Sequence, residues 1–593
     1  MELHGTPYER GYQHGQHFAN KIRSFYTMML TNSLLPYLNR EQPDIAEFLL
    51  TYQEDRYQDG QFSYRMLLES GQAIEPFIPQ EYIDEMHGVA DGAGLEYDDI
   101  LLINTLFDSM VAFRAMVFFI RAIQAPQVLS VDFGDLSTDG IDNDGDGVVD
   151  QPGEGFLEPY DPTRYASMVE VPPDATITIR LQDTEGVNPE LVRFQLNLDV
   201  YHDADEEVTT TVTGDPTDMM DVAFHMESGF EPAAEYTINI AAGDNTWVTD
   251  PPPAHARMMR DMRITFTTAG DGRERFEVRN LGYDDGRFQP PSSSFAVRDT
   301  ATADGEVRLA HHFSLLDANT SHKHTVVFVH HTDEGFSHAT VGWTGLIFGF
   351  SGMNSEGLAF SVNMSDTLNN PIAREFMSLL FYAQIKTEGI PVGIMGREML
   401  KNAATVEEAV EWLRDKPPTY GWNFLFADRN RSLTAVEMHA NVLDDATNIG
   451  FYSYTPDTSD ASNYDEHGQM LASVGPDDLR TASHYQHYYN DIDYQLLTFH
   501  IQSQRFWTSF FFKSLRTFYL MGDAIEQRYG QIDTAAMQEI IGLDELVDQR
   551  DSMNATVYEP ERGLLHFAMG QVPATSGPWV TVDIGAMFDG SAQ

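Results

Sequence analysis

The chain of 593 residues contains no cysteine. This absence excludes disulfide bonds, cysteine-ligated zinc sites and a thiol nucleophile. Long apolar runs are also missing, since the most apolar stretch, residues 100–131, is interrupted by Asp108, Arg114 and Arg121. No membrane-spanning helix is therefore predicted. The opening residues have neither a basic start nor an apolar stretch, so the printed sequence is expected to belong to a cytoplasmic protein or to a mature form.

Positive charge is in short supply. The sequence has 36 Lys and Arg against 91 Asp and Glu, a net charge of −55, and no lysine stands between Lys21 and Lys323. Nucleic acids and anionic lipids both require a basic face, so neither is expected as a partner. Such a surface suits salty or divalent-rich water, where ions screen its self-repulsion. A compositional bias of the source lineage is an equally good explanation.

The two ends of the chain combine helices and strands. Residues 1–125 are predicted to be mostly helical, because apolar residues recur at helical spacing in three segments: residues 26–37, 45–52 and 82–89. In residues 289–593, strands are expected at 325–331 and, with tight turns, within 339–363. A capping box at Thr405 begins a further amphipathic helix there.

The middle of the chain differs in kind. Residues 126–165 are rich in Asp and Gly, and residues 166–288 contain short alternating runs between proline-rich turns. These runs are residues 192–200, 236–240 and 262–266. Their alternation and spacing predict a small all-β sandwich, which resembles bacterial Ig-like domains. The sandwich is interpreted as an insertion, through which the protein could assemble with itself.

The Asp/Gly segment matches the first nine positions of a calcium-binding loop. Asp residues stand at the first, third, fifth and ninth positions, and a glycine at the sixth permits the bend. The predicted ligands are Asp142, Asp144, Asp146, Val148 and Asp150. Gly153 replaces the usual Glu at the twelfth position, and a solvated acidic linker is the alternative. Structural Ca²⁺ favours an extracellular or periplasmic location, because free calcium is scarce in the cytosol.

A set of motifs surrounds the serines at residues 292–294. It comprises Gly-Thr-Pro-Tyr-Glu-Arg-Gly-Tyr-Gln-His-Gly (5–15), Glu-Met-x-Gly-Val-Ala-Asp-Gly-Ala (85–93), Pro-Pro-Ser-Ser-Ser-Phe-Ala-Val (290–297), Ser-Gly-Met-Asn-Ser-Glu-Gly-Leu-Ala (351–359) and Pro-Val-Gly-x-x-x-Arg-Glu-x-Leu (391–400). In this order they resemble the acyl-coenzyme A:6-aminopenicillanate acyltransferase-like family. These are N-terminal-nucleophile (Ntn) hydrolases related to penicillin V acylase and bile-salt hydrolase. The resemblance covers residues 1–125 and 289–593.

The resemblance implies an α+β fold with a four-layer αββα core, and the structural Ca²⁺ of the Asp/Gly loop is the one cofactor that the sequence predicts. It also implies linear amide hydrolysis or acyl transfer on a small N-acyl amide. Family precursors cleave themselves before the nucleophile, whose freed α-amine then acts as its base. Ser292 stands at the position of the family's Cys. His484 and Arg505 are implied to line the pocket, with Asn354 or Asn363 as polar contacts.

Several departures from the family pattern leave two interpretations open. Residues 311–314 read His-His-Phe-Ser where the family has Arg-Asn-x-Asp, Ser483 replaces the oxyanion-hole Asn, and Pro291 replaces Gly before the nucleophile. A serine hydroxyl is also less acidic than a thiol. The chain is therefore either a self-cleaving serine amidase or a catalytically silent, secreted, calcium-stabilised binding, adhesive or assembly protein on the same scaffold.

Seven histidines between residues 311 and 338 suggest a rival metal site. On a strand, His322 and His324 would point to the same side and form a metal pair. No third ligand is identified by spacing, and histidines without a metal are the alternative. The sequence also has no Gly-x-Ser-x-Gly elbow in a strand–turn–helix setting, so an α/β-hydrolase triad has no support.

Overall fold

The computed structural model divides into two compact units, described here separately: residues 1–117, 289–490 and 514–593 form the first, and 118–288 with 491–513 the second. In the first unit the structure describes residues 1–27, 62–109, 292–314, 322–332, 334–364, 389–419, 421–439, 450–456, 472–483, 514–543, 546–547 and 552–588. In the second it describes 127–137, 149, 155–157, 167–182, 187–196, 199–201, 208–215, 219–230, 232, 235–244, 264–268 and 505–513.

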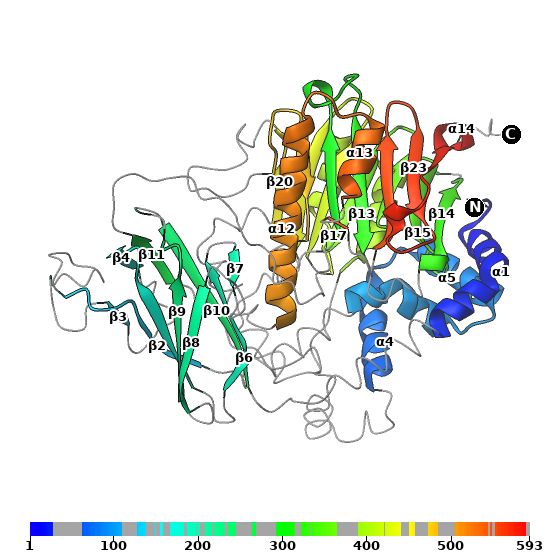
Figure 1. Cartoon of the computed structure of the whole chain (residues 1–593). Helices are drawn as coiled ribbons and strands as arrows, with labels where there is room; N and C mark the ends of the chain where they lie inside the picture. Colours follow the sequence, from blue (N-terminus) through cyan, green and yellow to red (C-terminus); the bar gives the residue numbers. More distant parts are fainter. Residues whose placement is uncertain are drawn as a thin grey trace. The chain divides into compact units, whose positions relative to one another are not determined.

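The first unit contains two large sheets (Figure 1). The eight-stranded sheet has the order β1 (Glu2–Leu3), β14 (Thr325–His330), β15 (His338–Trp343), β16 (Ser351–Asn354), β17 (Ala359–Met364), β18 (Trp422–Ala427), β19 (Leu433–His439) and β20 (Gly450–Tyr454). The six-stranded sheet has the order β21 (Asp478–Thr481), β12 (Ser293–Val297), β13 (Arg308–Ser314), β22 (Ser552–Glu559), β23 (Leu564–Met569) and β24 (Val580–Asp583). Only the β1–β14 pair is parallel among these strands.

The two sheets pack face to face around a shared core. Ala296 and Leu309 of the six-stranded sheet belong to the same buried cluster as Ala339 and Leu425 of the eight-stranded sheet. The other face of the six-stranded sheet is covered by α13 (Thr534–Ile541) and by residues 514–528 of α12 (Arg505–Arg528) (Figure 1). A second cluster there joins the strands to both helices through Phe295, Ala310, Val557, Met521 and Met537.

Four helices cover the outer face of the eight-stranded sheet: α1 (Pro7–Phe25), α5 (Gln80–Ala93), α9 (Val392–Asn402) and α10 (Val406–Arg414). Phe18 of α1 packs on Phe328 of β14, and a Cβ at Gly396 of α9 would lie 2.4 Å from the Phe360 ring of β17. The layer order is helix, sheet, sheet, helix. This mixed arrangement agrees with the αββα core expected from the sequence.

Helices α1 and α5 touch through their backbones. Gly11 and Gly15 of α1 face Gly88 and Gly92 of α5, and a Cβ at Gly11 would lie 1.9 Å from the Glu85 carbonyl oxygen. A Cβ at Gly88 would lie 2.1 Å from the carbonyl oxygen of Tyr8, so neither helix has room for a side chain here. The glycines of the first two motifs therefore serve helix packing.

The remaining helical segments are short or lie at the edges of the layers. They are α4 (Phe62–Ile74), residues 97–109, α14 (Ile584–Phe588), and the 3₁₀ turns η2 (Glu75–Phe77), η3 (Asp299–Ala301), η4 (His322–His324) and η8 (Ala574–Ser576). Within the described residues, none of the helices combines the length and apolar character needed to cross a membrane.

The second unit is built from two five-stranded sheets. One has the order β3 (Phe156–Leu157), β2 (Gln127–Asp132), β5 (Thr176–Gln182), β9 (Met219–Met226) and β8 (Val208–Asp215). The other has the order β4 (Ser167–Val171), β11 (Ile264–Thr268), β10 (Glu235–Asp244), β6 (Val187–Leu196) and β7 (Asp199–Tyr201). Side chains from both sheets share one buried cluster, which includes Ile179, Val222 and Met168. Its assignment to the Ig-like class stays a prediction.

Two sequence expectations about local structure are wrong. Residues 192–200 are not one strand, because β6 ends at Leu196 and β7 pairs back on it, with Asp199 opposite Leu196. His322 and His324 lie in the 3₁₀ turn η4 and not on a strand, so they do not form a same-side pair by alternation. His324 is instead buried, with its ring against Phe25 and Thr344.

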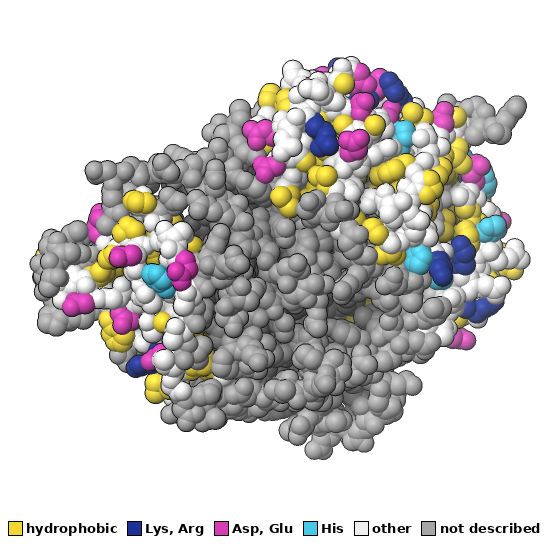
Figure 2. Space-filling view, in the orientation of Figure 1, with side chains coloured by type: hydrophobic (Ala, Val, Ile, Leu, Met, Phe, Trp, Pro, Cys, Tyr) yellow, Lys and Arg dark blue, Asp and Glu magenta, His cyan; other side chains and the backbone are white. Residues whose placement is uncertain are grey.

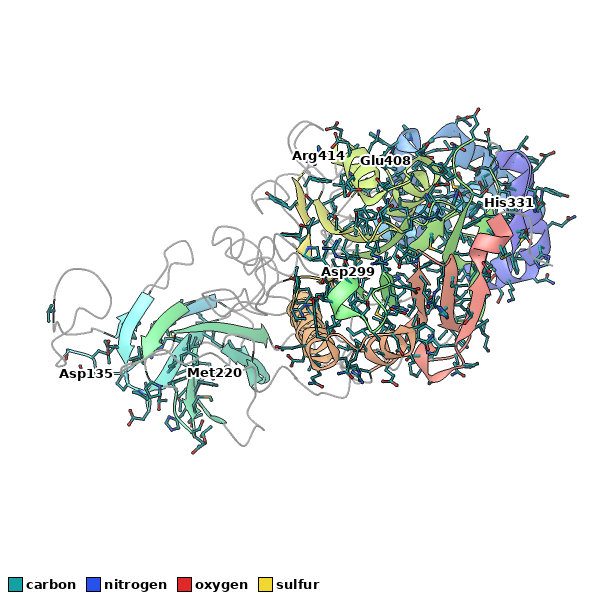
Figure 3. The ribbon with its side chains drawn as sticks, turned by 90° about the horizontal axis from the view of Figure 1, so that it is seen from above. Asp135, Met220, Asp299, His331, Glu408 and Arg414 are labelled. Carbon is teal, nitrogen blue, oxygen red and sulfur yellow. The ribbon has the colours of Figure 1, made fainter. Side chains whose placement is uncertain are left out.

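Other expectations agree with the described elements. Residues 82–89 lie within α5, and residues 236–240 lie within β10. Thr405 is the N-cap of α10, and its hydroxyl accepts a hydrogen bond from the Glu408 backbone N–H at 3.3 Å. Glu408 lies in the first turn of that helix and Arg414 in the last turn (Figure 3). Each charge is opposite in sign to the partial charge at its end of the helix, which is favourable. The predicted helices at 45–52 and most of 26–37 lie outside the described residues.

Candidate active site

Ser292 directly precedes β12, between β21 and β13 in the six-stranded sheet. Alternation along the strand points Ser292 and Ser294, like Ala296, toward the other sheet. The Ser292 hydroxyl accepts a hydrogen bond from the backbone N–H of Ser314 at 3.1 Å, and the residue is 8% exposed. A backbone donor therefore fixes the hydroxyl oxygen at the end of a central strand.

A polar cluster joins the two sheets beside this serine. The Ser294 hydroxyl lies 2.9 Å from the Ser361 hydroxyl and accepts a hydrogen bond from Asn363 Nδ2 at 3.0 Å. Asn363 Nδ2 also donates to Thr481 Oγ1 at 3.0 Å, and Ser483 Oγ donates to the Ser292 carbonyl at 3.3 Å. The structure thus brings Asn363 next to the serine strand, and three strands, β12, β17 and β21, meet there.

His311 faces the same inter-sheet space. It stands opposite Ser294 in the β12–β13 ladder and alternates in phase with Leu309, which lies in the inter-sheet core. Among the described residues, neither ring nitrogen has a hydrogen-bond partner. Burial lowers the pKa of His311 to about 3, so the ring is neutral near neutral pH. With so low a pKa the ring is a weak base, but its two free nitrogens allow it to pass a proton on by accepting at one nitrogen and donating from the other.

His312 points the other way, toward the helical layer. Its Nε2 lies 2.9 Å from the Ser552 hydroxyl, and burial lowers its pKa to about 3. The two adjacent histidines therefore have different environments, and only His311 joins the serine cluster. Residues two apart on a strand face the same side, so His311 shares the side of Leu309 and His312 does not. This alternation is the sequence signal that distinguishes the two histidines.

Aromatic rings form a wall on the same side. Phe313 stacks on Phe350 at 4.6 Å between ring centroids and lies 5.8 Å from Trp343. Phe107, from the helix at 97–109, approaches Phe350 at 5.1 Å. Phe313 directly precedes Ser314, whose backbone N–H donates a hydrogen bond to the Ser292 hydroxyl. The fixed hydroxyl therefore lies near a buried aromatic cluster, an environment that suits an acyl group.

Asn354 is placed elsewhere. It pairs with His338, the first residue of β15. Trp343 is the last residue of that strand and lies about 17 Å from His338 at the usual rise per residue. Its side-chain amide is fully used, donating to Leu400 O and Ala403 O and accepting from two backbone N–H groups. Asn354 therefore fastens a turn to α9, and the structure does not bring it to Ser292.

The side chains of the other predicted site residues are not described. His484 is not described, and Arg505 lies in α12 with its side chain undescribed. The five predicted calcium ligands, Asp142, Asp144, Asp146, Val148 and Asp150, are not described either. Their roles stay predictions.

The family motifs upstream and downstream of Ser292 converge on one buried ion-pair network. Arg397 of α9 makes two hydrogen bonds of 2.9 Å to the carboxylate of Glu85 in α5. Arg10 of α1 lies 3.6 Å from the same carboxylate. These side chains are almost wholly buried, so the network locks three helices together on the outer face of the eight-stranded sheet.

Neutral histidines surround Arg397. Its guanidinium donates to His330 Nδ1 at 2.9 Å and to His338 Nε2 at 3.3 Å. His338 Nδ1 lies 2.9 Å from the Phe336 carbonyl, which requires the proton on Nδ1. Burial and Arg397 lower the pKa of His338 to about 3 and that of His330 well below its ordinary value. These two histidines accept hydrogen bonds in a structural network and are not a metal pair.

Comparison with known families agrees with the resemblance seen in the motifs. Residues 313–453 match the family model described as acyl-coenzyme A:6-aminopenicillanic acid acyl-transferase. This match spans β14 to β19 and begins downstream of Ser292. The resemblance to that family is therefore confirmed over this part of the chain.

Two relatives match over short segments. An uncharacterized protein of Archaeoglobus fulgidus is 32% identical over 121 residues, which are 19% of this chain and 17% of that protein. The protein dcd1A of Dictyostelium discoideum is 26% identical over 117 residues, which are 20% of this chain and 26% of that protein. The chain thus spans about a quarter or less of the length of these relatives.

Solved structures with similarity include Ntn-type enzymes. A Caenorhabditis elegans ortholog of N-acylethanolamine-hydrolyzing acid amidase has a TM-score of 0.31 and 12% identity, covering 45% of this chain and 93% of that chain. A mutant of conjugated bile acid hydrolase from Clostridium perfringens has a TM-score of 0.27 and 11% identity, covering 49% of this chain and 92% of that chain.

Proposed function

We propose that this protein hydrolyses a linear N-acyl amide, or transfers its acyl group, with Ser292 as the nucleophile. The observation that carries the proposal is the position of Ser292 at the start of a central strand, with its hydroxyl held by the Ser314 N–H. The family match over residues 313–453 supports the same reaction class.

The proposed mechanism begins with self-cleavage. The Ser292 hydroxyl attacks the carbonyl carbon of Pro291, the peptide C–N bond breaks, and water hydrolyses the resulting ester. The products are a carboxylate on Pro291 and a free α-amine on Ser292. That amine then accepts the hydroxyl proton when Ser292 attacks the substrate amide, and returns it to the departing amine as the amide C–N bond breaks. Water or an acceptor amine next attacks the acyl-enzyme ester, takes the acyl group and frees the Ser292 hydroxyl.

The polar and apolar surroundings suggest how substrate is held. The aromatic wall of Phe313, Phe350 and Trp343 offers contact for an apolar acyl chain. His311, neutral and without a partner among the described residues, would relay a proton between the substrate and Ser292. The substrate class is therefore an N-acyl amide with an apolar acyl group.

A silent scaffold is the second candidate, favoured by one specific observation. Ser314, whose N–H bonds Ser292, stands where the resembling family carries an aspartate that contacts the nucleophile's amine. In this alternative the chain stays whole, and the second unit with its calcium loop mediates binding or self-assembly outside the cytosol.

Intact mass and N-terminal sequencing of the purified protein distinguish the two. A working enzyme splits into residues 1–291 and 292–593, and the Ser292→Ala variant stays uncut. The cut protein should then hydrolyse a fatty-acyl p-nitroanilide. A wild-type chain that remains a single uncut species after prolonged incubation refutes the enzyme proposal.

A further inference from the structure

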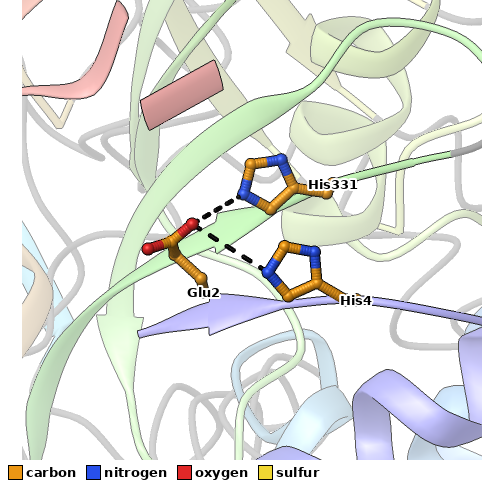
Figure 4. A group of neighbouring side chains, drawn as sticks. All are labelled: Glu2, His4 and His331. Carbon is orange, nitrogen blue, oxygen red and sulfur yellow. Dashed lines mark hydrogen bonds and ion pairs between the residues drawn. The ribbon is translucent and has the colours of Figure 1, made fainter. Parts of the chain in front are cut away.

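Three side chains from distant parts of the sequence converge at the edge of the eight-stranded sheet (Figure 4). His331 Nε2 lies 3.1 Å from Glu2 Oε2, and His4 Nε2 lies 3.9 Å from the same oxygen. One ligand-type atom from each of the three residues lies within 4.8 Å of the others. The site involves neither Ser292 nor its neighbours.

The two imidazole rings are arranged alike. They stack with centroids 4.4 Å apart and planes 3° from parallel, and the Nε2 of each is directed at the Glu2 carboxylate (Figure 4). Two nitrogens and one carboxylate oxygen therefore lie close together, and because the rings are parallel, one ring must turn before both Nε2 lone pairs reach the same ion. Stacking alone does not require the same nitrogen of both rings to face one carboxylate.

The backbone holds both histidines in place. Strand β1 pairs in parallel with β14, and the His331 N–H donates to the Leu3 carbonyl at 3.1 Å. The Gln13 side chain bonds both backbone groups of His4, donating to its carbonyl at 2.7 Å and accepting from its N–H at 3.3 Å. The cluster therefore rests on a sheet ladder and on α1, which limits how far the ligands need to move.

We propose that Glu2, His4 and His331 bind one divalent transition-metal ion, with zinc as the best fit. Two imidazoles and one carboxylate are a recognised donor set for Zn²⁺, with water in the remaining position. Donors at about 2.0–2.2 Å from the metal stand about 3.4 Å apart in a tetrahedron. The observed separations of 3.1 and 3.9 Å bracket that value.

The proposed site is reachable and has a structural consequence. The side chains of His4, Glu2 and His331 are 60%, 46% and 19% exposed, so an ion enters without opening the fold. Strand β1 has only two residues and lies at the sheet edge. A metal bridging it to the residue after β14 would fasten the N-terminal segment and α1 to the sheet.

Zn²⁺ titration by calorimetry tests the proposal on the full-length protein. Excess Ca²⁺ in the buffer occupies sites made of carboxylates alone, so the measured isotherm reports histidine-dependent binding. We expect one site per chain in the wild type, and affinity at least about tenfold weaker in His4→Ala and in His331→Ala. Co²⁺ should give a visible absorption band in the wild type that both variants lose.

His17→Ala is the matched control, because His17 is an exposed histidine on the adjacent helix α1 and outside the cluster. It should bind zinc like the wild type. His4→Ala removes the most exposed ligand, so it tests the site even where His331→Ala folds poorly. Identical isotherms for the wild type and His4→Ala, or equal loss in His17→Ala, overturn the proposal.

Discussion

Single residues around Ser292 differ from the family that the chain resembles, and His311 is the most informative of them. Its ring stands opposite Ser294, is neutral, and has no partner among the described residues. A buried polar group left unpaired costs free energy and so calls for an explanation. Proton transfer in catalysis supplies such an explanation under the proposed function.

We expect His311→Ala to lower kcat by about 100-fold on an N-acyl p-nitroanilide, since a positioned proton carrier contributes about that much. KM should change far less, because the aromatic wall that would hold the acyl group stays in place. His312→Ala is the control, because that neighbouring ring contacts Ser552 on the opposite face of the sheet. Its kcat should stay at the wild-type value even if the variant has a lower free energy of unfolding. Unchanged kcat in His311→Ala would remove His311 from the mechanism.

Asp108 offers a residue-scale test of stability. It is buried, accepts hydrogen bonds from Thr419 and the Val392 backbone, and burial raises its pKa from 3.8 to about 7. A carboxyl whose folded pKa is raised binds its proton more tightly in the folded state. Between about pH 4 and about pH 7 the carboxyl is ionised in the unfolded state and still largely protonated in the folded state. The free energy of unfolding therefore falls progressively as pH rises through this range.

Asp108→Asn should remove this part of the pH dependence. We expect the wild type to lose up to about 4 kcal/mol more than the variant between pH 4 and pH 7. Urea unfolding at both pH values measures it. Asp98→Asn changes an exposed carboxylate of the same helix and should follow the wild type. Parallel pH profiles for wild type and Asp108→Asn would contradict the assignment.

At the scale of elements, the packing of α1 on α5 depends on paired glycines. Gly11→Ala places a methyl group 1.9 Å from a backbone carbonyl oxygen, which no side-chain rotation relieves. The helices must separate, so we expect a loss of about 2–3 kcal/mol in unfolding free energy. Gln16→Ala, at an exposed position of the same helix, should change it by less than about 0.5 kcal/mol. Equal stability of the two variants would refute the close contact.

The ion-pair network joins the same helices to α9. Glu85→Gln leaves the buried Arg397 and Arg10 without a counter-charge, which should cost about 3–5 kcal/mol. Glu81→Gln on the same helix breaks a 2.6 Å pair with Lys401 that is partly exposed, and should cost no more than about 1 kcal/mol. Thermal denaturation of both variants compares them. A Glu85→Gln loss no greater than that of Glu81→Gln would mean that the network contributes little.

The sequence predicted elements better than contacts. Apolar periodicity located the core of α5 and the alternation in β10, because both depend on local spacing. It missed the break between β6 and β7, since the apolar alternation continues without interruption from residue 192 to residue 200. The interstrand position of His311 and the histidines around Arg397 depend on pairings between distant segments, which periodicity does not encode.

The candidate site was predictable only in part, for the same reason. The order of motifs pointed to Ser292, and the structure places Asn363 beside the neighbouring Ser294. Asn354 belongs to an equally recognisable motif, yet its amide fastens a turn to α9. A motif shows that a residue matters to the scaffold or the chemistry, and only the contacts separate these two roles.

For the whole molecule, a net charge of −55 means that cations affect both units. Acidic side chains stand among the described residues of each unit on the face that Figure 2 shows. Any salt should therefore stabilise the protein by screening repulsion. A specific calcium loop at residues 142–150, which lies outside the described residues, must be detected above this general effect.

We expect millimolar Ca²⁺ to raise the melting temperature of the second unit more than NaCl of equal ionic strength does, because only Ca²⁺ is bound by converging carboxylates. Asp144→Asn, which removes a predicted ligand, should lose the extra calcium response and keep the NaCl response. Asp135→Asn is the control, since this exposed aspartate precedes the loop and bonds only Ser137 in the described structure. Scanning calorimetry separates the effects. If Asp144→Asn and the wild type respond equally to calcium, the loop is a solvated acidic linker, and screening alone explains the stabilisation.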